Sequence, residues 1–136
     1  MAVQYSTTVR NAFGNAWVAA IGGACKIRIY SGSMPANCAA ALSGNTLLAE
    51  LTGNATLAPA ASGGVLTLNS ITADASADAS GTAAFYRIYD SGGTTCHEQG
   101  TVTATGGGGD MELLTTAIVA AMGVSITSWT KTSPGA

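Results

Sequence analysis

Hydrophobic and polar positions follow two different periods along this chain, first a helical one and then a period of two. After Ser6 the apolar residues recur at the i, i+3, i+4, i+7 spacing of an amphipathic helix. These apolar positions are Val9, Ala12, Phe13, Ala16 and Ala20. Ser6 or Thr7 can cap the helix, and Gly22 can end it. We therefore expect a helix over about 6–21, with a stripe of Val9, Phe13 and Trp17 that packs against a sheet or a partner chain.

Beyond Gly23 the pattern is typical of β-strands. In the segment from Lys26 to Tyr30, Ile27 and Ile29 alternate with polar residues, which places the two isoleucines on one face. Further strands are predicted at 47–52, 65–69, 84–89, 94–104, 111–116 and 124–132. The strands 84–89 and 94–104 form a predicted hairpin, and Val124 and Ile126 lie on the face opposite to Trp129. The segment 72–80 is either an edge strand or a loop.

Short strands separated by glycine-rich turns indicate the fold class. About seven strands with turns at short intervals predict a mainly β protein, a jelly-roll-like β-sandwich with one N-terminal amphipathic helix. We expect a single domain over 1–136, with the sandwich at about 25–132. An internal echo, Arg28-Ile29-Tyr30 and Arg87-Ile88-Tyr89, suggests two similar strand–turn units that are neighbours in the fold.

Composition narrows the classes of function. The chain has 136 residues, of which 47% are hydrophobic and only 9% charged, and its net charge is -2. This balance offers no basic patch for nucleic acid and no polybasic segment for membranes. The longest apolar runs are shorter than the roughly 20 residues that span a bilayer. The N-terminus lacks the basic start and apolar stretch of a signal peptide, so synthesis in a cytoplasm is expected.

Candidate catalytic and metal-binding residues are few. The single histidine, His97, stands between Cys96 and Glu98, and strand alternation predicts that these two share the face opposite to the imidazole. We therefore predict no metal site, no catalytic residue and no cofactor. Asp74 and Asp78 could hold calcium or act on sugars, although a solvated loop is the plainer interpretation. Gly106 to Gly109 lack the lysine of a phosphate loop and are interpreted as a hinge or linker.

Two sets of residues leave alternatives open. Cys25, Cys38 and Cys96 are interpreted either as free thiols or as one free thiol beside a Cys38–Cys96 bridge formed in an oxidising medium.

If Ile29 and Ile88 point inward, each arginine and its tyrosine share the opposite face. This second set, Arg28, Tyr30, Arg87 and Tyr89, is a candidate protein–protein interface, because Arg and Tyr are enriched at hot spots. The alternative is an ordinary outer face with a cation–π contact.

Several segments together resemble a known family. They are 1–12, Arg28-Ile-Tyr-Ser-Gly32, Pro35-Ala-Asn-Cys38, Ala60-Ala-Ser-Gly-Gly64, 87–96 and Pro134-Gly135-Ala136. The chain resembles the capsid cement (decoration) proteins of tailed bacteriophages, including a Bordetella podophage, and the resemblance extends over nearly the whole length. It implies a jelly-roll-like fold and a role outside a capsid shell, but assigns no contact residues. Gly106 to Gly109 and Leu113-Leu114 depart from the pattern.

We therefore expect a virion structural protein, not an enzyme. The resemblance implies the major capsid protein as partner, a place on the capsid exterior, and stabilisation of the shell. Low charge favours self-association into a dimer or higher oligomer, with no nucleic acid and no membrane as partner. The alternative function is a carbohydrate- or receptor-binding β-sandwich module of a phage tail or fibre, which should display an aromatic platform in a cleft.

Overall fold

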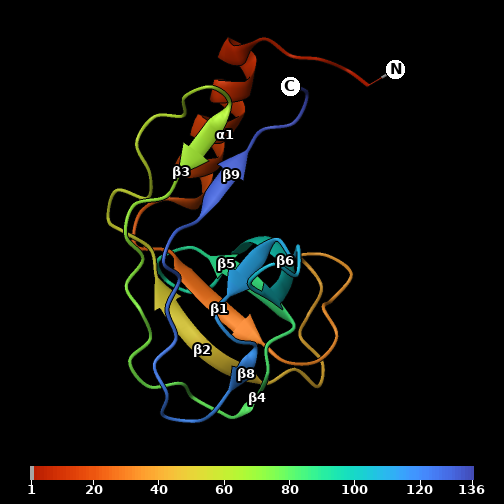
Figure 1. The fold of residues 1–136 in the computed structure, drawn as a ribbon, viewed down its shortest axis with the longest axis vertical. Helices are drawn as coiled ribbons and strands as arrows, with labels where there is room; N and C mark the ends of the chain where they lie inside the picture. Colours follow the sequence, from red (N-terminus) through yellow and green to blue (C-terminus); the bar gives the residue numbers. More distant parts are fainter. Residues whose placement is uncertain (1) are drawn as a thin grey trace.

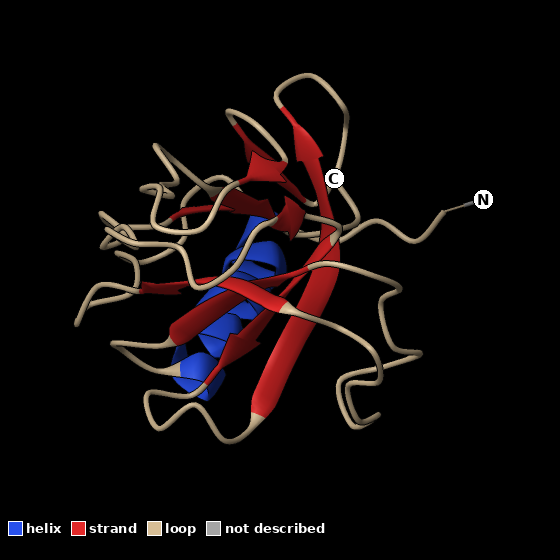
Figure 2. Ribbon diagram, turned by 90° about the horizontal axis from the view of Figure 1, so that it is seen from below, coloured by secondary structure: helices blue, strands red, loops and turns tan. Residues whose placement is uncertain are grey.

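The structure, a computed structural model, describes residues 2–136 and is mainly β with one N-terminal helix (Figure 2). The helix is α1 (Thr7–Ile21). The strands are β1 (Lys26–Tyr30), β2 (Leu47–Thr52), β3 (Val65–Thr67), β4 (Gly81–Thr82), β5 (Phe85–Tyr89), β6 (Cys96–Ala104), β7 (Met111–Leu113), β8 (Ala117–Ile118) and β9 (Thr130–Thr132). The expected helix and the 26–30 and 47–52 strands are confirmed within a residue.

The elements gather at two ends of an elongated molecule. At one end α1 lies beside the two-stranded sheet of β3 and β9, close to the C-terminus (Figure 1). Towards the other end lies a five-stranded sheet in the order β2-β1-β5-β6-β7, and a further pair, β4 and β8, lies beyond it. No helix in the described part of the chain is long and apolar enough to cross a membrane.

Local signals in the sequence fix both ends of α1. The Ser6 hydroxyl accepts a hydrogen bond from the Val9 N–H at 3.3 Å, which satisfies one of the free donors of the first turn. At the other end Gly22 has a φ of 79° and donates its N–H to the Val18 carbonyl. Glycine adopts this left-handed conformation without strain, so the helix ends where the sequence predicts.

The buried face of α1 is not the predicted one. Val9 and Phe13 keep 39% and 41% of their surface exposed, whereas Arg10, Gly14 and Ile21 are buried. The expected packing of Val9 and Phe13 against a sheet is therefore wrong, and only Trp17 of that stripe packs against the core. The alternative, packing against a partner chain, stays a prediction.

Polar contacts explain why α1 turns this way. The Arg10 guanidinium donates to the carbonyls of Ser133 and Gly63, at 3.0–3.3 Å. Gly14 lies so close to the segment before β3 that a Cβ there would stand 3.1 Å from the Ala61 Cβ. The helix turn at Arg10 thus donates hydrogen bonds to loop carbonyls. One turn later, the missing side chain of Gly14 allows the helix backbone to approach the segment before β3 closely.

In the large sheet, β1 and β5 pair with Ile27 opposite Ile88 and Arg28 opposite Arg87. The two Arg-Ile-Tyr segments are thus direct neighbours, as the echo suggested. Strand alternation then defines an inner face with Ile27, Ile29, Tyr86 and Ile88, and an outer face with Arg28, Tyr30, Phe85, Arg87 and Tyr89. The inner-face residues belong to the main hydrophobic core, together with Leu48, Leu51 and Leu66. Burial of each large side chain contributes about 1.5–3 kcal/mol.

A β-bulge in the predicted hairpin changes where its residues point. The ladder of β5 and β6 pairs Ile88 with Glu98 but Tyr89 with Cys96, so His97 is the extra residue. Because directly opposed residues share a face, Glu98 lies on the inner face with Ile88, and Cys96 lies on the outer face with Tyr89. The expectation that Cys96 and Glu98 share a face is therefore wrong.

The glycine-rich segment joins two parallel strands. β6 and β7 pair in parallel with Val102 opposite Met111, which normally requires a connection of about a dozen residues or more. Here the chain returns within 105–110, because Gly106 and Gly108 adopt φ values of +85° and +78°. The Glu112 carboxylate accepts the N–H groups of both glycines at 3.1 Å. These glycines therefore form an internally bonded turn.

The C-terminal region differs from the predicted long strand. Only Thr130–Thr132 forms β9, which pairs with β3, and Val124 makes a single bridge to Asp74. Val124, Ile126 and Trp129 are all buried, so alternate faces do not describe this segment. The ambiguous 72–80 segment is mostly loop, held by bridges at Thr72 and Asp74.

Candidate interaction surface

The four residues predicted as an interface lie on one face, but most of them are covered. Tyr30, Arg87 and Tyr89 are buried, with 4%, 3% and 7% of their surface exposed. Tyr30 stacks on Phe85 with ring centroids 5.3 Å apart, and the Arg28 guanidinium lies 4.8 Å from the centre of the Tyr89 ring. Burial in the chain's own fold leaves only Arg28 of the four accessible to a partner.

The cover on the outer face is the segment 31–46, and Arg87 holds it there. The Nη2 of Arg87 donates to the carbonyl oxygens of Asn37 and Ala40, at 3.0 and 2.8 Å. Its Nε donates to Gln99 Oε1, and the Gln99 amide donates to the Pro35 carbonyl at 2.7 Å. A buried guanidinium with these partners is satisfied, which is the condition for its burial. Arg87 is therefore an internal clamp.

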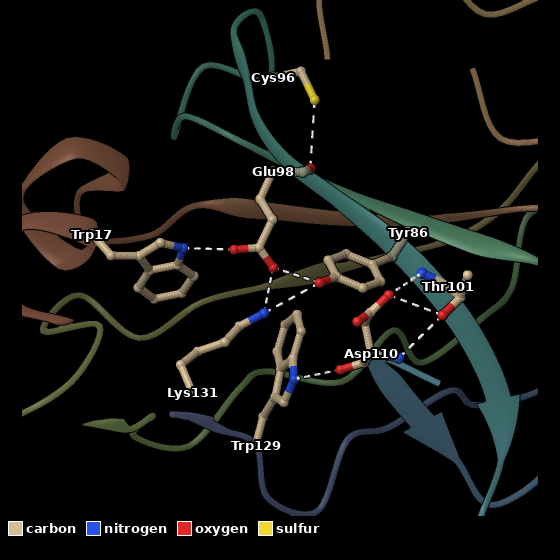
Figure 3. A network of polar contacts seen from close by, with 8 residues as sticks. All are labelled: Trp17, Tyr86, Cys96, Glu98, Thr101, Asp110, Trp129 and Lys131. Atoms are coloured by element: carbon tan, nitrogen blue, oxygen red, sulfur yellow. Dashed lines mark hydrogen bonds and ion pairs between the residues drawn. The ribbon is translucent and has the colours of Figure 1, made fainter. Parts of the chain in front are cut away.

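A second polar cluster lies on the inner face, where the helix, the large sheet and β9 meet (Figure 3). The Glu98 carboxylate accepts hydrogen bonds from Trp17 Nε1 at 2.6 Å, from the Tyr86 hydroxyl and from the Lys131 ammonium (Figure 3). The Lys131 ammonium also lies 4.1 Å from the centre of the Trp129 ring and 5.5 Å from that of Trp17. Ion pairing and cation–π attraction thus act on the same lysine.

This inner cluster is a junction between distant parts of the chain. Burial, followed by the neighbouring Glu98 charge, raises the pKa of Tyr86, so its hydroxyl remains a donor across the physiological range. Each polar group in the cluster already has a partner, and the five side chains come from α1, β5, β6, β9 and the segment before β9. The cluster thus connects α1 and β9 to the large sheet.

The residues singled out for chemistry lie apart. His97 is exposed at the bulge, and residues 2–136 contain no group of three or more His, Cys, Asp or Glu side chains that could hold a metal ion. One carboxylate oxygen of Asp74 accepts the Glu50 N–H and the other accepts the Ser76 N–H, each at 2.9 Å, so Asp74 shapes its own loop. Asp78 is exposed and its backbone N–H bonds to the Leu48 carbonyl.

The outward face of α1 is the surface that best matches a binding role. Val9 and Phe13 are exposed there, and Tyr5 contacts Phe13 edge-to-face at 5.2 Å between ring centroids. Val3, in the segment before the helix, is 66% exposed. The one charged residue of the helix, Arg10, is buried and does not belong to this exposed face. We call Val3, Tyr5, Val9 and Phe13 the helix patch, and its uncharged apolar character is typical of a contact surface.

The sequence pattern identified Val9 and Phe13 of the helix patch but left open whether they pack against a sheet or a partner chain. One further signal in the sequence could have decided between the two. Arg10, Asn11, Gly14 and Asn15 are polar or small and recur at helical spacing, as residues that bond to loops do. Asn11 and Asn15 accept the backbone N–H groups of Gly64 and Ala61, both at 2.8 Å.

A smaller exposed apolar region lies at the other end of the molecule. Leu114 and Val119 are 92% and 60% exposed. Leu114 lines a recess together with Ile118, Met122 and Val124. Comparison with family models, with curated proteins and with solved structures gave no match to this chain.

Proposed function

We propose that this chain is a virion structural protein, a capsid cement (decoration) protein that binds the outside of a shell of major capsid protein and stabilises it. The observation that carries the proposal is the helix patch, an uncharged apolar surface on a helix whose only charge is turned inward. The resemblance of segments across the whole chain to phage cement proteins supports the same role.

The fold proposed for this function is a jelly-roll-like β-sandwich. The hydrophobic core supports this fold. In it, residues from the inner face of the five-stranded sheet pack with residues from the small sheets, among them Leu66 of β3 and Ile118 of β8. Two layers that bury one core are the general plan of a sandwich. A rigid domain of this kind can bridge neighbouring subunits of a shell.

The cations of the chain support a non-ionic mode of attachment. All five make hydrogen bonds within the chain; they are Arg10, Lys26, Arg28, Arg87 and Lys131. Because these groups already have partners, binding to the shell relies on apolar burial and on neutral hydrogen bonds. The same engagement of the cations disfavours nucleic acid as a partner, since phosphate contacts need available Lys and Arg side chains.

Attachment in many copies follows from the surface. A neutral surface offers little charge repulsion between neighbours, so copies can sit close together on the shell and contact one another. We propose a dimer or higher assembly formed on the capsid exterior.

The proposal is tested by adding purified protein to shells assembled from the major capsid protein encoded in the same genome. We expect saturable binding in a fixed ratio to the capsid subunits, measured by co-sedimentation. Molar sodium chloride should leave the protein bound, because salt screens charges but does not weaken apolar burial. Urea weakens apolar burial, so it should release the protein at a concentration below the midpoint at which the protein itself unfolds. Release by salt alone would contradict the non-ionic mode, and the absence of binding would contradict the function.

A further inference from the structure

Two cysteines that lie far apart in the sequence meet on the outer face of the large sheet. Cys96 begins β6, and the bulge at His97 turns its side chain to the face that also carries Tyr89 and Arg87. Cys38 belongs to the segment 31–46 that covers this face. The residues on either side of Cys38 are bonded to Arg87, which lies on the same face as Cys96, and the two thiols are close enough for Cys38 to raise the pKa of Cys96.

The surroundings hold both thiols in place. Cys38 lies in a tight turn in which the Ala40 N–H bonds to the Asn37 carbonyl at 3.1 Å. Arg87 donates to the carbonyls of Asn37 and Ala40, on either side of the cysteine. On the facing strand the Cys96 thiol donates to the Glu98 carbonyl at 3.5 Å. Each sulfur is thus carried by backbone that is fixed by hydrogen bonds, so little ordering is needed to join them.

We propose that Cys38 and Cys96 form an intramolecular disulfide by exchange with a low-molecular-weight disulfide such as oxidised glutathione, and that this bond fastens the segment 31–46 to β6. In the reaction both cysteine sulfurs are oxidised, one S–S bond of the oxidant is broken, and two molecules of reduced glutathione are released. The proposal does not depend on the proposed function, because it concerns the chain alone.

The exchange proceeds in two steps. The thiolate of one of the two cysteines attacks the oxidant, forms a mixed disulfide and releases one reduced glutathione. The other cysteine then loses its proton to solvent and displaces the second glutathione. Burial, followed by the hydrogen bond and charge coupling to Cys38, raises the pKa of Cys96, so little of this cysteine is thiolate at neutral pH.

The third cysteine is excluded by its position. Cys25 is 1% exposed within the hydrophobic core, and burial raises its pKa. It therefore remains a thiol in the folded protein. The bond would add a covalent tie between a long loop and the sheet. A tie of this kind restricts the unfolded chain and raises the melting temperature.

The test uses reduced, purified full-length protein treated with oxidised glutathione at neutral pH. Trypsin cleavage after Lys and Arg separates the three cysteines into the peptides 11–26, 29–87 and 88–131. We expect mass spectrometry without reduction to find 29–87 linked to 88–131, with 11–26 still carrying a free thiol. The oxidised protein should melt roughly 10 °C higher than the reduced protein.

Cys38→Ser and Cys96→Ser are the matched controls, and each should melt like the reduced wild type with or without oxidant. Stable glutathione adducts on Cys38 without a linked peptide would overturn the proposal. So would a link to the Cys25 peptide, a disulfide between two chains, or a linked protein whose melting temperature is unchanged.

Discussion

Arg28 and Arg87 lie directly opposite one another in the ladder of β1 and β5, yet their guanidinium groups have separate partners. Like charges in this position normally destabilise a sheet. Arg28 is instead paired with the Glu50 carboxylate, with its Nε at 2.6 Å from Oε2, while Arg87 is bonded to two loop carbonyls and to Gln99. The two similar Arg-Ile-Tyr segments therefore differ in role, because Arg28 forms an ion pair and Arg87 holds a loop against the sheet.

Substitution of Arg87 should therefore be costly. Arg87→Ala leaves the carbonyls of Asn37 and Ala40 without their donor and should lower the free energy of unfolding by about 3 kcal/mol. Arg87→Lys should recover little of this, because an ammonium cannot reproduce the planar fork. Arg28→Ala, at a more exposed ion pair, should cost under about 1 kcal/mol. Urea unfolding of the three variants measures these differences, and equal costs for Arg87→Ala and Arg28→Ala would refute the clamp.

The ion pair of Lys131 and Glu98 should contribute more to the free energy of unfolding than the ion pair of Lys26 and Glu50 on the outer face. Lys131→Met removes the charge from between Glu98 and the aromatic rings and should cost about 2 kcal/mol, a value lowered for the partial exposure of the pair. A double-mutant cycle with Glu98→Gln should give a coupling energy of about 1–2 kcal/mol. Lys26→Met is the control, because its ammonium stands 3.8 Å from Glu50, and it should cost less than about 0.5 kcal/mol. Additive effects of the Lys131 and Glu98 substitutions would show that the two groups do not act together.

Much of this fold follows from local patterns. The alternation of Ile27 and Ile29 predicts β1, the Ser6 hydroxyl predicts the start of α1, and the repeated Arg-Ile-Tyr predicts neighbouring strands. Each of these signals depends on residues close in sequence, where propensity and periodicity act. They predict the helix and the longer strands, but not the two-residue strands β4 and β8 or the late start of β9.

What the sequence does not predict depends on contacts between distant residues. Arg10 is buried because carbonyls at Gly63 and Ser133 lie beside it, and no period in the helix encodes those partners. The bulge at His97 likewise reverses the faces of its neighbours, although the segment reads as a regular strand. Local periodicity therefore predicts neither the exposure of Val9 and Phe13 nor the burial of three of the four proposed interface residues.

Backbone packing at the end of α1 gives a sharp test of the fold. A Cβ at position 23 would lie 2.0 Å from the Ala55 carbonyl oxygen, which no rotamer can relieve. Gly23→Ala should therefore cost about 2–4 kcal/mol. At Gly123 the nearest atom would be 3.8 Å away and φ is not in the left-handed range, so Gly123→Ala should change little. Thermal unfolding of the two variants compares them directly, and similar melting temperatures would contradict the docking of this turn.

Acid sensitivity should arise in part from Asp110. The Thr101 N–H and hydroxyl each donate to its carboxylate at 2.9 Å, and these hydrogen bonds hold the pKa of Asp110 below its usual range. A depressed folded-state pKa means that the contribution to stability is complete above the unfolded pKa, near 4, and is lost as the pH falls through the folded value. Asp110→Asn should therefore lose less stability than the wild type between about pH 5 and pH 2. Melting temperatures measured across this pH range test the prediction, and Asp78→Asn, at an exposed aspartate, is the control that should follow the wild type. If Asp110→Asn also followed the wild type, Asp110 would not be a source of the acid sensitivity.

The helix patch carries the central claim, because attachment to a shell requires a surface that the fold itself does not use. Val9 and Phe13 are about two-fifths exposed, so Val9→Ser with Phe13→Ser should lower the free energy of unfolding by about 1 kcal/mol at most. The same double substitution should remove the apolar contact with the shell. Leu114→Ser, at an exposed leucine outside the patch, is the matched control.

The most direct measurement is therefore the occupancy of capsid shells by these three proteins, determined by co-sedimentation at equal concentration. We predict that the wild type and Leu114→Ser saturate the shells, and that the Val9→Ser, Phe13→Ser variant loses at least tenfold in affinity while still melting as a folded protein. Equal occupancy by the double variant, or no binding by the wild type, would contradict the account.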